Sequence, residues 1–306
     1  MTPQNAFHSR PAQRDASWWR VYGVLLYPLT LKIPSVTLTI DMPIKERRTK
    51  ILLLLFLMSN LSTEDQISET NVNFEFVGIN PTLQNIFDLS FNQKTKGTLS
   101  AMMREGLIEK SQTNPNDQNS NNQNQYKLTE KGYGVLCLQF PFFRFLKEEW
   151  DGRWRVISYE IPETKREIRD RFRREMRGWG LGPWHRSFWL TPHPIIENLR
   201  DLVYGREEEK YIQAFESTHV FGDLNLLVEK VWQKTELEKK YRELFKKWHD
   251  VLSAEKTKEQ KMKEIISFYI ELLRLDPGLP KTLIGKKWIG FEAFSIFKEV
   301  KSILLK

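Results

Sequence analysis

Residues 93–110 read QKTKGTLSAMMREGLIEK, and residues 126–132, beyond an amide-rich loop, read YKLTEKG. The first stretch predicts an amphipathic helix over residues 93–105, and Gly106 is a stop signal at its end. The apolar face of this helix consists of Leu99, Met102 and Met103. The other face is polar and largely basic, so the helix has one side suited to a core and one suited to solvent or a ligand.

Two short strands follow this helix and predict a β-hairpin. They cover residues 107–110 and 126–128, and the tip between them, residues 111–125, is almost entirely Asn, Gln, Ser and Asp. Such a composition cannot bury enough apolar surface to order itself, so we expect the tip to be mobile. Thr129 then caps another helix. This succession of helix, glycine and long hairpin indicates a winged helix-turn-helix.

A winged helix can read DNA when one helix face is anchored in a core and the other reaches the major groove. We expect base contacts from the polar face, at Lys94, Thr95, Lys96 and Thr98. Phosphate contacts are expected from the surrounding basic residues, Arg47, Arg48, Arg104, Lys110, Lys127 and Lys131. Two alternatives stay open: the face is only a solvated surface, or the winged helix binds another protein.

Composition bounds the class of protein. The chain has 306 residues and a net charge of +8, with 47 basic against 39 acidic side chains, which favours polyanionic partners without identifying one. Its single cysteine, Cys137, excludes an intrachain disulfide framework and fits a reducing cytoplasm. The longest apolar run, residues 51–58, is far shorter than the ~20 residues that span a bilayer. We therefore expect a cytoplasmic protein without a membrane segment.

The order of patterns along the chain predicts an α+β protein of several domains. The expected parts are an extension (1–44), a winged-helix DNA-binding domain (45–135), a connector (136–149), a ferredoxin-like central domain (150–222) and a helical C-terminal domain (223–306). The extension lacks regular periodicity, and Met42 offers an alternative start, so we expect it to be either disordered or not translated.

The central part predicts a β-α-β-β-α-β order with one strand that the pattern does not place. Strands are expected at residues 156–161, 187–190 and 211–215, and helices at 165–179 and 195–204. The first of these helices carries an apolar stripe, Ile168, Phe172, Met176 and Trp179, and a basic stripe, Arg166, Arg169, Arg173 and Arg177. One face is expected to pack in the core and the other to face outward.

The C-terminal part is helical and highly charged. It contains a seam with alternating spacings of four and three residues, formed by Leu237, Tyr241, Leu244, Trp248 and Val251. The seam covers about two heptads. Packing within the chain and dimerisation are both open alternatives for it.

Three motifs resemble the repressor family of the phenylacetate-degradation operon, the PaaX-like regulators. They are WDGRWR at residues 150–155, YEIPE at 159–163 and DPGLP at 276–280, the last followed by Trp288 and Gly290. With the winged helix, the likeness covers residues 45–306. It implies a dimeric repressor with a ligand-responsive C-terminal region and, in that family, an aryl acyl-coenzyme A thioester as inducer. No individual residue carries that ligand specificity over to this chain.

The central domain is also similar to the small CRISPR-associated adaptation proteins, a fold that includes metal-dependent nucleases. Their first strand ends in a key aspartate, and the matching position here is Glu160, with Glu163 as the only other nearby carboxylate. A carboxylate at this position could hold Mg²⁺, a hard cation that prefers oxygen ligands. We favour pairing of Glu160 with the basic stripe, and we expect neither a metal site nor another cofactor.

These observations predict a non-enzymatic transcriptional regulator that binds double-stranded DNA as a homodimer. We expect it to be a repressor that responds to a small effector, for which an acyl-coenzyme A thioester is the candidate that the resemblance implies. The alternative from another class is a magnesium-dependent nuclease built on the central domain around Glu160.

Overall fold

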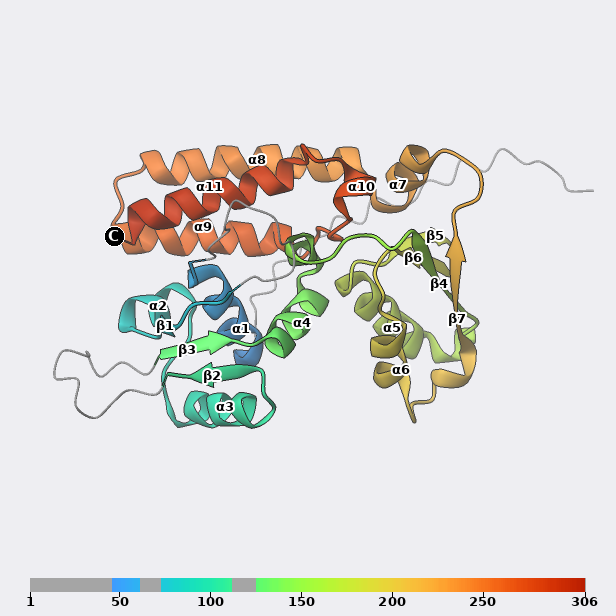
Figure 1. The fold of residues 1–306 in the computed structure, drawn as a ribbon, viewed down its shortest axis with the longest axis horizontal. Helices are drawn as coiled ribbons and strands as arrows, with labels where there is room; N and C mark the ends of the chain where they lie inside the picture. The colour runs from blue at the N-terminus through green and yellow to red at the C-terminus, as the bar shows by residue number, and fades with distance from the viewer. Residues whose placement is uncertain (1–45, 61–72, 112–124, 306) are drawn as a thin grey trace, which may run out of the picture. The chain divides into compact units, whose positions relative to one another are not determined.

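The computed structural model describes residues 46–60, 73–111 and 125–305. By its contacts the chain divides into residues 1–41 and a unit of residues 42–306, and every feature below belongs to the second. The expected N-terminal extension and most of the amide-rich loop lie outside the described residues. Helices alternate with two antiparallel sheets along the chain (Figure 1), so the α+β class is confirmed.

The first group of elements surrounds a three-stranded sheet of order β1-β3-β2. Its members are α1 (Arg47–Met58), β1 (Val77–Gly78), α2 (Pro81–Ile86), α3 (Gln93–Arg104), β2 (Ile108–Lys110), β3 (Gln125–Leu128) and α4 (Glu130–Gln139). The two strands expected from the sequence pair antiparallel, with Ile108 opposite Leu128. The pattern missed β1 and left α2 unassigned, because two and six residues are too short to show a period.

Local hydrogen bonds set both ends of α3. The side chain of Asn92 accepts a hydrogen bond from the backbone N–H of Thr95 at the start. At the end, Gly106 has a φ of +70°, and the N–H of Leu107 donates to the carbonyl of Met102 at 2.9 Å. This is a Schellman turn, which favours glycine because it needs a left-handed residue. The helix therefore ends one residue before the predicted boundary.

The central elements form a four-stranded sheet of order β5-β6-β4-β7, in which all neighbours are antiparallel. They are β4 (Arg153–Tyr159), α5 (Arg166–Gly178), β5 (Gly182–His185), β6 (Phe188–Thr191), α6 (Ile196–Val203) and β7 (Ile212–Thr218). The expected β-α-β-β-α-β order is confirmed. The unplaced strand is β5, whose four residues include Pro183 and give no alternating pattern.

One face of this sheet packs on α5 and α6, which lie on the same side of it in Figure 1. Ile157 and Trp189 from the strands join Phe172 and Leu199 from the helices in a single buried cluster. The alternate residues of β4 point to the opposite face, because successive side chains of a strand alternate. That opposite face carries no helix over Phe188 and Phe215, which are 41% and 54% exposed.

The WDGRWR motif stabilises the start of β4. The Arg155 guanidinium is buried and donates to both carboxylate oxygens of Asp151, at 2.8 and 2.6 Å, and to the carbonyl of Pro192 at 3.1 Å. The indole N–H of Trp150 donates to the carbonyl of Arg153 at 2.9 Å. The hydrogen bond from Arg155 lowers the pKa of Asp151. The motif is thus explained by packing and ion pairing within the chain.

The C-terminal elements are α7 (Leu224–Trp232), α8 (Lys234–Ser253), α9 (Lys258–Leu273), α10 (Lys281–Ile284) and α11 (Ile289–Leu304). Helices α8, α9 and α11 pack against one another, as Figure 1 shows. The five residues of the predicted seam on α8 are all buried, so the seam serves packing within the chain. None of the helices in the described part of the chain has the length and hydropathy needed to cross a bilayer.

The DPGLP motif forms a buried polar turn between α9 and α10. The carboxylate of Asp276 accepts hydrogen bonds from the hydroxyl of Tyr241 at 2.7 Å and from the backbone N–H of Gly278 at 2.8 Å. The indole N–H of Trp288 lies at 3.4 Å from the same carboxylate. Burial nevertheless raises the pKa of Asp276. The motif fixes the chain direction between two helices by satisfying a buried acid.

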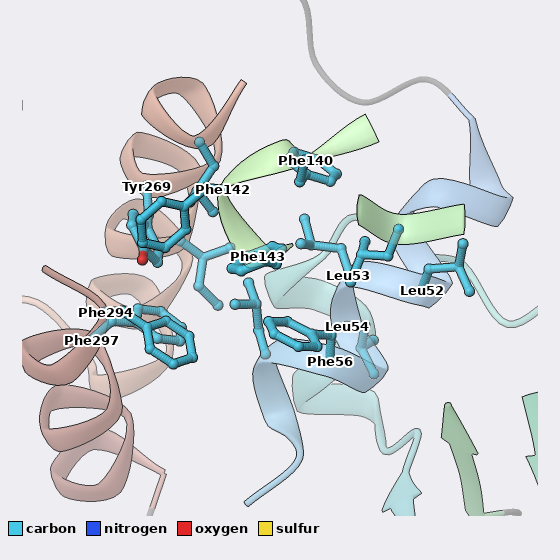
Figure 2. Close-up of a cluster of buried hydrophobic side chains, with 14 of the residues drawn as sticks. Leu52, Leu53, Leu54, Phe56, Phe140, Phe142, Phe143, Tyr269, Phe294 and Phe297 are labelled. Atoms are coloured by element: carbon cyan, nitrogen blue, oxygen red, sulfur yellow. The ribbon is translucent and has the colours of Figure 1, made fainter. Parts of the chain in front are cut away.

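An aromatic segment, the 3-10 helix η2 (Pro141–Leu146), joins the first group of elements to the C-terminal helices. Phe143 lies 4.3 Å from Phe56 of α1 and 6.2 Å from Phe294 of α11, measured between ring centroids. Figure 2 shows these rings in one buried cluster with leucines of α1. The residues expected to act as a connector therefore belong to a core shared by the first group of elements and the C-terminal helices.

Candidate nucleic-acid interface

The inner face of α3 is anchored in the first group of elements. Leu99 and Met102 are buried, and α3 contacts both α1 and β2. Helix α1 is itself held in the core, because its residues 51–57 are all buried. Helix α4 packs closely against Leu107, which precedes β2. This approach requires a glycine at position 132, since a Cβ there would lie 2.0 Å from the carbonyl oxygen of Leu107. These contacts hold α3 rigidly by one side.

The outer face of α3 is exposed and basic. Its exposed residues are Gln93, Lys94, Lys96, Gly97, Ser100 and Arg104. Within the part of the chain that the structure describes, no carboxylate forms an ion pair with Lys94, Lys96 or Arg104. Thr98 is half-buried, and its hydroxyl donates to the carbonyl of Lys94 at 2.9 Å. The structure thus places three of the four predicted base-contacting residues at or beside this outer face.

Thr95 does not belong to this face, so its predicted base contact is wrong. Its side chain is 0% exposed, and the hydroxyl donates to the carbonyl of Ser90 at 2.6 Å. The residue lies in the first turn of α3, where its backbone N–H is capped by Asn92 and its side chain turns toward the preceding loop. Thr95 therefore stabilises the start of the helix from within.

The predicted phosphate-contacting residues divide into two sets. Arg47, Arg104 and Lys110 are exposed and form no ion pair with any described residue. The other three are held by internal partners. Lys127 pairs with Glu109 at 3.0 Å and lies 5.1 Å from the centre of the Phe76 ring.

Arg48 and Lys131 both bind Glu105, at the end of α3. The guanidinium of Arg48 pairs with the Glu105 carboxylate, and the ammonium of Lys131 donates to the Glu105 carbonyl at 2.9 Å. These bonds tie α3 to α1 and to α4. The convergence involves residues 57 and 26 positions apart in sequence, so no local pattern could reveal it.

Sequence reasoning missed Ser100 and Gly97, which share the exposed face with the lysines. A glycine inside a helix costs roughly 0.5–1 kcal/mol relative to alanine. A Cβ at Gly97 would meet no atom within 4 Å, so packing within the chain does not require the glycine. A glycine inside a helix and between basic residues is the sequence signal that could have indicated this position. Glycine is common where a backbone closely approaches a ligand.

Lys50 fixes α1 against the loop after α2. Its ammonium donates to the carbonyl of Asp88 at 2.9 Å, and Lys263 of α9 pairs with the Asp88 carboxylate at 2.8 Å. Burial lowers the pKa of Lys50, and the charge of Asp88 partly offsets this effect. This lysine therefore joins α1 to the loop after α2.

The second carboxylate expected for the alternative site around Glu160 is engaged in an ion pair. Glu160 is exposed at the end of β4, but the carboxylate of Glu163 pairs with Arg169. Among the described residues, no three His, Cys, Asp or Glu side chains gather in a way that could hold a metal ion. The arginine stripe of α5 has other partners: Arg173 binds the hydroxyl of Tyr159, and Arg177 lies over the ring of Trp189. Among the described residues no ion pair joins Glu160 to the stripe, so the expected pairing is wrong.

Comparison with known proteins finds family matches in the central and C-terminal parts of the chain. The model of the PaaX protein central Cas2-like domain matches residues 147–227, and that of the PaaX-like protein C-terminal domain matches residues 232–306. None of the curated proteins matches the chain. Among solved structures, uncharacterized protein Rv0674 from Mycobacterium tuberculosis has a TM-score of 0.45 at 15% identity, covering 85% of this chain and 95% of that one. The two family models together cover half of the sequence, and the chain belongs to the PaaX-like family, with a Cas2-like central domain.

Proposed function

We propose that this protein is a DNA-binding transcriptional regulator whose residues 45–135 form a winged helix. The observation that carries the proposal is α3, with a buried underside and an exposed face bearing Lys94, Lys96 and Arg104 without internal ion-pair partners among the described residues. Membership of the PaaX-like family supports a regulatory rather than an enzymatic role.

In the proposed complex, α3 lies in the major groove and the hairpin of β2 and β3 follows the phosphate backbone. Lys94, Lys96 and Thr98 face the bases, together with Ser100, while Gly97 lets the helix approach closely. Phosphates are contacted by Arg47, Arg104 and Lys110. Lys131 adds positive charge, whereas Arg48 and Lys127 are paired with Glu105 and Glu109 and mainly hold the helix and hairpin in place.

Regulation is proposed to follow the family resemblance: a dimeric repressor, with a ferredoxin-like central domain, that releases DNA when a small effector binds. An acyl-coenzyme A thioester is the effector that the resemblance implies. The effector must bind the two states of the protein with different affinity, since otherwise it shifts no equilibrium.

What supports dimerisation is an exposed part of the four-stranded sheet, on the face where α7 packs only against Trp154 and its neighbours. Phe215 lies opposite Val156 and Phe188 opposite Ser158, so both rings project from the face that α5 and α6 leave uncovered. Exposed apolar rings at one site often mark a protein contact. Sedimentation should give a dimer that Phe215→Ser weakens and that Leu226→Ser, a more exposed apolar control on α7, leaves intact.

The test of the proposed function is to recover genomic DNA fragments bound by the purified protein and to measure gel shifts on them with and without Mg²⁺. A shift specific for the recovered sequence, without cleavage, is expected. Metal-dependent cleavage that Glu160→Ala abolishes would instead establish the nuclease alternative. Absence of any preference for duplex DNA at low salt would reject the regulator in favour of a protein-binding module.

A further inference from the structure

A cavity of about 770 Å³ lies between the segment around β1 and the ends of α9 and α11. This volume falls within the range of small-molecule sites. Apolar side chains from both sides form much of its wall, among them Met58, Phe76 and Leu83 from the first group of elements and Leu304 from α11. A ligand here would contact the C-terminal helices and also the end of α1, the helix that packs against α3.

Three lysines give one side of the cavity positive charge. Lys258 begins α9, while Lys298 and Lys301 lie one turn apart on α11. Two glutamates also line the cavity. Glu259 accepts a hydrogen bond from the amide of Asn85, and the charge of Glu75 acts on Lys301. Three lysines against two glutamates leave the lining with a net positive charge. Apolar walls with surplus cationic groups suit a molecule that has an apolar body and an acidic end.

Lys301 links this cavity directly to α1. Its ammonium, on a residue only 9% exposed, donates to the main-chain oxygens of Leu57 at 3.2 Å and Ser59 at 2.9 Å, with that of Met58 at 3.5 Å. Helix α1 has no basic residue in its own last turn. A cation from α11 therefore satisfies the carbonyl groups at the negative end of α1.

We propose that this cavity binds a soluble amphipathic anion, with its apolar body against Met58, Leu83 and Leu304 and its acid group at the three lysines. The acid competes with the α1 carbonyl groups for the ammonium of Lys301, so binding loosens the cap on α1. Because α1 packs against α3, the change reaches the proposed DNA-binding face. This last consequence rests on the proposed function, whereas ligand binding itself does not.

The test is calorimetric titration of the full chain with sodium decanoate and with decyl phosphate, and with decyltrimethylammonium and decanol as charge controls. We expect one anion bound per chain and much weaker binding of the cation and the alcohol. The two anions separate a preference for carboxylate from one for phosphate. No anion binding, or equal binding of the cation, overturns the proposal.

Variants then locate the site. Lys258→Glu/Lys298→Glu should weaken anion binding about tenfold or more, because two charge-assisted contacts become repulsive. The matched control, Lys246→Glu/Lys281→Glu, makes the same charge change at exposed lysines outside the cavity and should bind normally. Thr82→Trp narrows the cavity from α2 and should also reduce binding. Circular dichroism checks that each variant folds, and unchanged binding by the folded cavity variants overturns the assignment.

Measuring duplex binding of the same samples without any anion keeps the two proposals separate. Anion binding without duplex binding would support the cavity and reject the regulator. Duplex binding without anion binding would support the regulator and reject the cavity.

Discussion

Two helices of this protein carry similar runs of basic residues but use them differently. On α5, Arg171 pairs with the buried Glu208 at 2.8 Å, Arg166 with Asp170 at 3.6 Å, and Arg169 with Glu163. On α3, Lys94 and Lys96 form no ion pair with any described residue. The arginines of α5 are used mainly within its own domain, whereas the charges of α3 remain available to a partner.

This difference shows that the number of basic residues on a helix is a poor guide to a binding face. What matters is whether carboxylates or aromatic rings of the same chain already face them. Surface ion pairs contribute little to stability individually, about 0–1 kcal/mol, yet they neutralise the charge that a polyanion would meet. Glu163 lies just before α5 and Glu208 lies beyond the end of α6, so the helix sequence contains neither of these partners.

The strongest test reverses charges on each helix in turn. Lys94→Glu/Lys96→Glu should lower duplex affinity about a hundredfold, because two proposed DNA contacts become repulsive. Arg166→Glu/Arg174→Glu makes the same charge change on exposed α5 residues and should lower it no more than about threefold, through net charge alone. Fluorescence anisotropy with a labelled duplex measures both, and equal losses would remove the distinction between the helices.

The second test concerns stability. Arg171→Met removes one ion-pair partner of the Glu208 carboxylate, which is 1% exposed, and leaves Arg206, at 3.8 Å, as its ion-pair partner within the described part of the chain. We expect a loss of about 2 kcal/mol in the free energy of unfolding, less than for a fully buried pair because Arg171 is half-exposed. Arg174→Met, an exposed neighbour on the same helix, should change it by less than about 0.5 kcal/mol. Urea titrations followed by circular dichroism decide, and similar values for the two variants would contradict the internal role of α5.

The third test separates stability from binding on α3. Gly97→Ala should raise the free energy of unfolding by about 0.5–1 kcal/mol, because alanine favours the helix and its Cβ meets nothing. The same change should weaken duplex binding if the helix backbone lies close to DNA. Gly134→Ala is the matched control: an exposed glycine in α4 with equal space around it, where we expect stabilisation without loss of binding. Unchanged binding by Gly97→Ala would remove the reason for the glycine.

The smallest effect is the titration of Glu163, just before α5. The hydrogen bond from Arg169 lowers the pKa of Glu163 below its ordinary value. A lowered pKa stabilises the fold above the ordinary pKa, and this contribution is lost as the pH falls through the folded value. Carbon NMR of the Glu163 carboxyl group should therefore show a midpoint below the usual glutamate range. Arg169→Met should return it to that range, and an unchanged midpoint would show that the pair does not persist in solution.

The sequence by itself determined the features whose causes are local. The period of α3, its glycine stop, the pairing of β2 with β3 and the β-α-β-β-α-β order were all predicted, because each depends on neighbouring residues. The motifs quoted from the central and C-terminal parts also indicated the PaaX-like family, which the family models confirm.

Only the tertiary structure decided which polar residues are available and what the buried ones bind. Thr95 and Lys96 are one position apart, yet the first is buried beneath the preceding loop and the second is exposed, because a helix turns by about 100° per residue. The capping of α1 by Lys301 joins residues more than 240 positions apart. Such contacts depend on how distant elements pack, and no local pattern in the chain encodes that.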